Sequence, residues 1–238
     1  MTNRRRFGVR AVVRLLLQCT LFVAVAPLAA TLFIRFVHPP TTAMMLTRTW
    51  QRWRADESPA YPRRDVVTRD NVAPILRRAV LAAEDDRFYL HNGFDFQEIE
   101  NAIASRRSGG SMRGASTISQ QVVKNIFLWE GRSWIRKGLE AYITLWLEVV
   151  VPKERILDLY VNLAEWGDGV FGIEAAAQYY FKKSAAKLNA DESARLASVL
   201  PSPRRWSPRG AAAATRAARI RQRMVYASPR PATTPQPD

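Results

Sequence analysis

Glutamate at the end of an apolar segment is the first group in this chain that could do acid–base chemistry. Glu84 follows the segment 75–83, which is apolar apart from Arg77 and Arg78, and is itself followed by two aspartates. A carboxylate beside buried apolar groups has a raised pKa, which suits it to act as a general base. A solvated acidic helix end is the alternative interpretation, and Glu84 taken alone favours that alternative.

A second segment joins a glycine-rich stretch to a row of polar side chains. Three glycines lie within residues 109–114, and two arginines stand within residues 105–108. A helix is predicted to begin near Ser116, and residues three or four apart share a helix face. One face then carries Thr117, Gln120, Gln121 and Lys124. A row of polar donors with a lysine at its end is suited to bind a phosphate or a sugar. The alternative is that this face of the helix is simply solvated.

The third segment pairs cations with a second glutamate. Arg136 lies four residues and Lys137 three residues before Glu140. Ion pairs at this spacing are common on helix surfaces and stabilise a helix by about 0.2–0.5 kcal/mol each. Because an apolar stripe runs along the same segment, its polar face is expected to point away from the core.

Two matches to known motifs are rejected. Gly167–Gly172 has the spacing of a dinucleotide-binding loop, but that loop follows a strand, and here a helical segment precedes it. The pair Ser184 and Lys187 matches the Ser-x-x-Lys motif without its companion motifs. The glycine-rich segment is therefore predicted to be a turn between helices.

The elements that must position these residues have helical periodicity. Three apolar stripes recur at spacings of three and four. They comprise Ile75, Leu76, Ala79, Val80 and Ala83; Leu139, Ile143, Trp146, Leu147 and Val150; and Ile156, Leu159, Tyr160 and Leu163. Asn189 and Glu192 predict a capping box for a helix that ends before Pro201. The fold class is predicted to be mainly α, with a folded domain over residues 65–226 and a disordered tail over 227–238, which is rich in proline and threonine.

The N-terminal region predicts a membrane helix over residues 15–37. Leu15–Ile34 contains no charged side chain, and twenty helical residues span about 30 Å, the thickness of a bilayer core. Five arginines precede it, so residues 1–14 are predicted to be a cytoplasmic tail. A cleaved signal peptide is the alternative, since small residues at 29–30 offer a cleavage site.

Residues 38–64 form a proline-containing connector between the apolar segment and the folded domain. Met44, Met45, Trp50 and Trp53 recur there at partly helical spacing among arginines. A short helix packed on the domain and an amphipathic segment at the membrane interface both fit this pattern.

Composition limits the partners. The formal net charge is +15, which favours an anionic partner: nucleic acid, an acidic membrane surface or a phosphorylated substrate. With one cysteine, Cys19, and two histidines, the chain can form no internal disulfide and is a poor candidate for a zinc site.

Four blocks, in order, resemble the family 51 glycosyltransferases of peptidoglycan synthesis, in particular their monofunctional biosynthetic members. The blocks are Glu84-Asp85-x-x-Phe88-x-x-His91-x-Gly93, Gly114-Ala115-Ser116-Thr117-Ile118-x-Gln120-Gln121-x-x-Lys124-Asn125, Arg136-Lys137-x-x-Glu140 and the segment 155–181. Leu200-Pro201-x-Pro203 also fits. The resemblance covers about residues 70–206, and the four blocks together are far more specific than any one.

The resemblance implies a lysozyme-like helical domain with a second, membrane-associated lobe. It implies polymerisation of lipid II into β-1,4 glycan strands, with inversion and release of undecaprenyl pyrophosphate. Glu84 matches the catalytic base, and Glu140 matches a second carboxylate that orients cations or a metal. The cations expected beside the leaving group are Lys124, Arg132, Arg136 and Lys137, and the groups expected to position sugars and phosphates are Ser116, Thr117, Gln120, Gln121 and Asn125.

The resemblance also implies cofactors, partners and a location. Mg²⁺ or another divalent cation is the expected cofactor, and no organic cofactor is expected. Expected partners are lipid II, the growing glycan chain, inner-membrane lipids, and proteins of cell division or cell-wall synthesis. The expected location is the inner membrane with a periplasmic domain, which separates the basic residues from nucleic acid.

Two other functions remain as alternatives. A lytic transglycosylase or muramidase presents a glutamate on a similar fold, but it cleaves a neutral glycan and has no use for several cations beside its carboxylates. A membrane-tethered scaffold without catalysis would tolerate loss of both Glu84 and Glu140.

Overall fold

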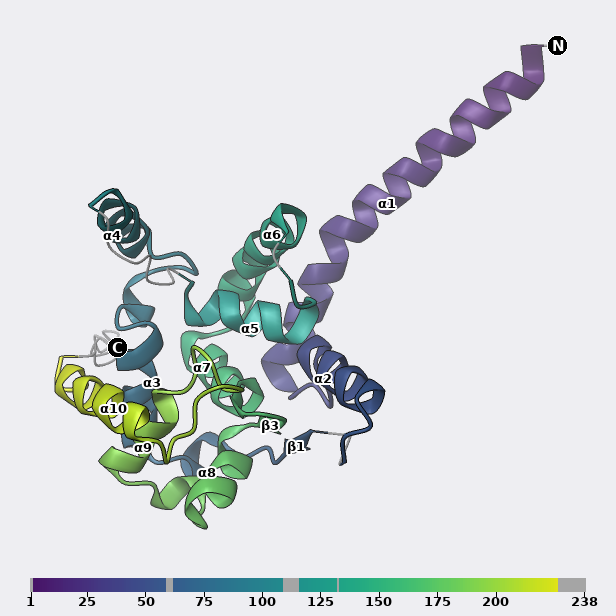
Figure 1. Cartoon of the computed structure of the whole chain (residues 1–238). Helices are drawn as coiled ribbons and strands as arrows, with labels where there is room; N and C mark the ends of the chain where they lie inside the picture. The colour runs from purple at the N-terminus through teal and green to yellow at the C-terminus, as the bar shows by residue number, and fades with distance from the viewer. Residues whose placement is uncertain (1, 59–61, 109–115, 132, 227–238) are drawn as a thin grey trace, which may run out of the picture.

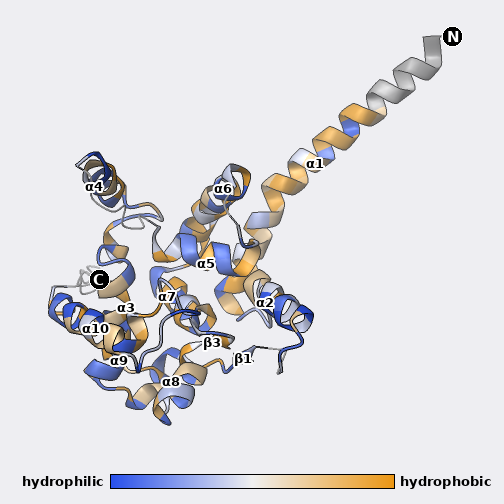
Figure 2. Cartoon of the chain, viewed as in Figure 1, coloured by the Kyte–Doolittle hydropathy of each residue, from blue (hydrophilic) through white to orange (hydrophobic). Residues whose placement is uncertain are grey.

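The computed structural model describes residues 2–58, 62–108, 116–131 and 133–226, with side chains from residue 11 onward. One long helix, α1 (Thr2–Phe36), projects from a body of shorter helices (Figure 1). Its segment Ala11–Phe36 is long and apolar enough to cross a membrane (Figure 2). This finding agrees with the predicted membrane helix.

The last two turns of α1 belong to the body. Thr31 and Ile34 are buried there, and α1 packs along α6 (Trp134–Val150). Arg35 donates to the carbonyl of Val150 at 2.8 Å. The helix continues through Pro27, and the Thr31 hydroxyl donates to the Pro27 carbonyl at 2.9 Å.

The connector contains helix α2 (Ala43–Arg54), which Thr42 caps by accepting from the amide of Met45. Met44 and Met45 are buried, so the predicted packed helix is confirmed. Trp50 and Trp53 on the same helix are 54% and 69% exposed. One face of α2 therefore packs while another presents tryptophans to the surroundings, and the interfacial alternative stays a prediction.

The remaining helices confirm the mainly α class. They are α3 (Pro74–Glu84), α4 (Phe96–Arg107), α5 (Ile118–Phe127), α7 (Lys153–Leu163), α8 (Ile173–Phe181), α9 (Ala190–Ala197) and α10 (Ala211–Arg223), with 3-10 turns at Arg69–Asn71, Phe88–Leu90 and Ala185–Lys187. The capping box at Asn189 and Glu192 is present at the start of α9, as predicted.

The glycine-rich segment after α7 differs from the predicted turn between helices. It forms a short hairpin of β2 (Glu165–Gly167) and β3 (Val170–Phe171), and β1 (Arg63–Arg64) pairs with β3 in parallel. Gly169 has a φ of +67°, which a hairpin turn requires and which glycine adopts without strain. Strands of two and three residues leave too little alternation to be predicted from the sequence.

One core joins side chains of several helices, where α5 packs on α7 and α3 packs on α9. Leu76, Ile118, Ile156 and Leu159 are completely buried there. The apolar stripes of α3 and α7 thus face the core as predicted. These two helices, together with α5 and α6, carry the side chains of the site.

Candidate active site

Glu84 is the last residue of α3, where its carboxylate meets α5. Gln121 on α5 donates from its side-chain nitrogen to a Glu84 oxygen at 2.8 Å. The Tyr160 hydroxyl on α7 donates to the oxygen of the same amide at 3.1 Å. Burial raises the pKa of Tyr160 well above its ordinary value, so the tyrosine stays a proton donor. Its bond orients Gln121, whose amide then faces the carboxylate.

Lys124 lies one helical turn beyond Gln121 on α5. Burial lowers its pKa, and Glu140 is the largest influence that opposes the shift. Arg136 and Lys137 also lower that pKa, whereas Glu84 raises it. Lys124 is therefore within electrostatic reach of both glutamates and both neighbouring cations. This cluster of two carboxylates and three cations brings together residues from three helices.

Glu140 differs from the sequence expectation of an outward polar face. It is 3% exposed, and its two carboxylate oxygens accept from Arg136 at 2.7 Å and from Lys137. The helix turns this face toward α5, because α6 packs against both α1 and α5. A buried carboxylate needs such partners, since desolvation of an unpaired charge is strongly unfavourable.

Asp85 fixes the end of α3 against the start of α5. Its carboxylate accepts from the amide of Ile118 at 3.0 Å and lies 2.9 Å from the Nε2 atom of His91. The Thr117 hydroxyl donates to the carbonyl of Gly93 at 2.6 Å. Asp85 and His91 belong to the first sequence block, 84–93, and had no role assigned from the sequence. The fold shows that Asp85, with His91 beside it, connects this block to the second block, 114–125.

The polar residues predicted to position substrate fall into different environments. Thr117 and Gln120 are buried and bond to each other in a capping box at the start of α5. Ser116 is exposed just before that helix, and Asn125 is half-buried on it. Arg132 lies outside the described residues. Capping accounts for the side chains of Thr117 and Gln120, so the proposal below places neither against substrate.

A group that the sequence analysis did not identify supports the loop between α5 and α6. Arg48 on α2 is 6% exposed and binds both oxygens of Glu130, at 3.0 and 2.7 Å. Its Nε atom donates to Glu165 at 3.1 Å. The carbonyl of Gly131 accepts from Arg136 at 2.9 Å. The loop thus connects α2, which follows the apolar helix, to the cation that pairs with Glu140.

The comparisons with known proteins agree with this geometry. The family model described as Transglycosylase matches residues 53–228. The chain belongs to the transglycosylase family. That family's lysozyme-like helical fold, expected from the motifs, accords with the mainly helical body.

Three related proteins align with this chain over most of their own length. A protein of Ectopseudomonas mendocina (strain ymp) is 48% identical over 91% of this chain and 90% of its own. A second, from Xanthomonas axonopodis pv. citri (strain 306), is 50% identical over 82% of this chain and 80% of its own. A third, from Pseudomonas putida (strain GB-1), is 47% identical over 89% and 90%. Each of the three is named biosynthetic peptidoglycan transglycosylase.

Among the described residues, neither glutamate belongs to a group of three carboxylate or imidazole ligands close enough together to hold a divalent cation. Both oxygens of Glu140 already accept from cations. Asp85, His91 and Asp95 bring ligand atoms within 4.8 Å of one another, but Asp95 accepts from the amide of Glu98, and Asp85 is held as described above. Protein hydrogen bonds account for this cluster, so no step below passes through a metal.

Proposed function

We propose that this chain is a peptidoglycan glycosyltransferase that polymerises lipid II into glycan strands. The observation that carries the proposal is the cluster around Lys124, where two glutamates meet three cations. Transfer of a sugar from a pyrophosphate needs a base for the attacking hydroxyl and positive charge for the leaving group. The cluster offers both within one region of the fold.

Glu84 acts as the base in this mechanism. Its carboxylate takes the proton from the 4-hydroxyl of the acceptor sugar as that oxygen attacks the anomeric carbon of the donor. The bond from that carbon to the pyrophosphate oxygen breaks, and the leaving group keeps the electron pair. Attack from the opposite face inverts the α link to a β-1,4 link. The amide of Gln121 holds the carboxylate in place before the proton moves.

Lys124, Arg136 and Lys137 stabilise the departing pyrophosphate. Preorganised charges in a site with little water stabilise a developing negative charge more strongly than they would in bulk water. Glu140 holds Arg136 and Lys137 in position rather than taking a proton. A lytic enzyme releases no pyrophosphate, so it has no comparable negative charge for three such cations to stabilise, which disfavours the lytic alternative.

The anchor keeps the enzyme in the plane of its lipid-linked substrates. We place the folded domain on the periplasmic face of the inner membrane, because five arginines precede the apolar segment. Protease added to intact spheroplasts should digest the domain. Protection of the domain until the membrane is broken would exclude this orientation.

Replacing Glu84 with glutamine tests the assignment directly. The amide cannot accept the proton, so the purified Glu84→Gln protein should make no polymer from lipid II. Activity would be followed by gel separation of labelled glycan strands, with and without the family's inhibitor moenomycin. Thermal unfolding and circular dichroism would establish that the variant is folded.

Two outcomes would contradict the proposal. Full polymerisation by folded Glu84→Gln would remove this residue from the base role. Release of soluble fragments from intact glycan strands by the unmodified protein, without polymer from lipid II, would favour a lytic enzyme. A scaffold would show neither activity.

A further inference from the structure

Two adjoining hollows lie on the body away from the cluster around Lys124. The first, of about 510 Å³, is lined by Arg63, Arg64, Asp65, Ala175, Gln178, Tyr179 and Lys182. The second, of about 270 Å³, is lined by Asp168, Tyr179, Tyr180, Pro203, Arg204, Arg205, Trp206 and Ser207. Tyr179 lines both, so the two hollows form one surface, called here the Tyr179 surface.

Two tyrosines, Tyr179 and Tyr180, lie at the centre of this surface and are held in place by their packing. Tyr180 packs so closely on Gly167 that a Cβ atom there would lie 2.0 Å from its hydroxyl. The carbonyl of Tyr180 accepts from Arg209 at 3.0 Å. The rings of Tyr179 and Tyr180 meet edge to face at 4.8 Å between centroids. Tyr179 nevertheless remains 43% exposed, so part of its side chain is open to a ligand.

The surface is positively charged. Five of its lining residues are basic and two are acidic. The Arg63 guanidinium lies 5.2 Å from the centre of the Tyr179 ring, and Lys182 is exposed at the end of α8. Aromatic faces beside guanidinium groups suit a ligand with both apolar ring faces and carboxylates.

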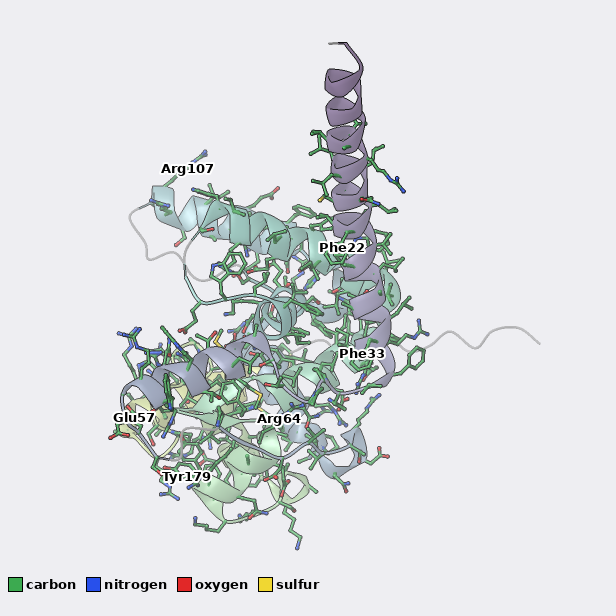
Figure 3. The ribbon with its side chains drawn as sticks, turned by 90° about the vertical axis from the view of Figure 1, so that its right-hand side faces the viewer. Phe22, Phe33, Glu57, Arg64, Arg107 and Tyr179 are labelled. Carbon is green, nitrogen blue, oxygen red and sulfur yellow. The ribbon has the colours of Figure 1, made fainter. Side chains whose placement is uncertain are left out.

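The position of the surface excludes the membrane as its partner. Tyr179 lies at the end of the molecule opposite the projecting part of α1 (Figure 3). The surface also reaches toward the site, because Arg204 on its rim lies 4.0 Å from Glu130. Glu130 precedes Gly131, whose carbonyl accepts from Arg136. Arg204 therefore links the Tyr179 surface to the loop that contacts Arg136.

We propose that the Tyr179 surface is a non-catalytic binding site for an anionic amino-sugar strand. Sugar rings lie on Tyr179, and carboxylates of the strand's acidic side groups pair with Arg63 and Lys182. The identity of the ligand as a peptidoglycan strand rests on the proposed function. Binding there holds the polymer after it leaves the catalytic groups.

Binding of purified strands tests the site apart from catalysis. The full chain in detergent micelles would be titrated with fluorescently labelled, uncross-linked peptidoglycan strands that carry no lipid. Tyr179→Ala and Arg63→Glu should each weaken binding about tenfold, which corresponds to about 1.4 kcal/mol. Arg78→Glu on α3, an exposed position outside both hollows, makes the same charge change and should leave affinity unaltered.

The chemistry of the ligand is tested with two other probes. Neutral N-acetylglucosamine oligomers should bind at least tenfold more weakly than the strands, because they lack carboxylates. Polyglutamate should bind without sensitivity to Tyr179→Ala, because it lacks sugar rings. Equal strand binding by Tyr179→Ala, Arg63→Glu and the unmodified protein would overturn the proposal, as would an equal loss in Arg78→Glu.

Failure of the proposed function would look different. Absence of polymer from lipid II in the unmodified protein would refute the catalytic proposal but leave strand binding measurable. Conversely, Tyr179→Ala should consume lipid II at the unmodified initial rate, because Tyr179 lies outside the catalytic cluster. A large fall in that rate, in a folded protein, would place Tyr179 in catalysis and contradict a non-catalytic site.

Discussion

At the scale of single residues, neighbouring side chains set the orientation of Glu84 and the pKa of Lys124. Gln121 joins Tyr160 to Glu84, so a buried phenol orients a carboxylate through an amide. Lys124 has no carboxylate at contact distance among the described residues, yet both glutamates raise its pKa against the effect of burial. A cation held this way is available to an incoming pyrophosphate.

The charge of Lys124 predicts how the reaction depends on pH. Burial lowers the lysine's pKa below its ordinary value of 10.5, so the charge is lost as pH rises through a lower value. The polymerisation rate should therefore fall on the alkaline side below pH 10.5. Arginine stays charged throughout this range, so Lys124→Arg should lose this alkaline fall or shift it upward.

The measurement is kcat/KM for lipid II against pH in the two proteins. Lys124→Ala should lower the rate about a hundredfold at neutral pH, the usual effect of removing one group that stabilises a transition-state charge. The same alkaline fall in Lys124→Arg would assign it to another group. Glu84, Glu140, Arg136 and Lys137 are the charged groups that act on this lysine.

At the scale of elements, α2 supports the site through a loop, although none of its residues belongs to the catalytic cluster. Arg48 binds Glu130 and Glu165, and so holds the loop that precedes α6. Burial raises the pKa of Glu165, and the Arg48 charge opposes that rise. Removing the arginine leaves a buried carboxylate without its cation.

Arg48→Ala should lower the free energy of unfolding by about 3 kcal/mol, the usual effect of breaking a buried ion pair. It should also lower kcat for lipid II more than it raises KM, because the loop positions Arg136, which stabilises the charge that develops on the leaving group. Arg54→Ala is the matched control, since Arg54 is an exposed arginine on the same helix that lies over Trp50. Equal thermal midpoints in the two variants would show that the Arg48 contacts carry no stability.

At the scale of the whole molecule, α1 is long and apolar enough to cross a membrane and is also part of the body. Its outer turns are exposed, whereas Thr31 and Ile34 are buried against the helices of the domain. Arg155 on α7 donates to the carbonyl of Ile34 at 3.2 Å. The length of helix required for folding is therefore shorter than the length required to cross a bilayer.

Two truncations separate these roles. Removal of residues 1–23 should release the protein from membranes and leave its thermal midpoint unchanged, because the packed turns and the Ala24 carbonyl that Tyr142 contacts remain. Removal of residues 1–37 should also lower the free energy of unfolding by about 2–5 kcal/mol, the usual effect of deleting a large buried side chain such as Ile34. Equal midpoints would show that α1 contributes nothing to the body.

The sequence by itself determined the helical class, the apolar segment and the order of the motifs. Local periodicity and composition encode these features, which is why the stripes of α3 and α7 and the capping box at Asn189 were predicted correctly. The domain boundaries and the catalytic roles remain predictions.

Only the tertiary structure decided which side chains meet. Glu84 and Tyr160 are 76 residues apart, and their link through Gln121 depends on how three helices pack. Packing also turned Glu140 inward and brought Arg48 to Glu130, which helix periodicity cannot reveal because it specifies a face without naming the neighbour. The hairpin at β2 and β3 formed for the same reason, since its short strands owe their pairing to contacts made by the folded chain.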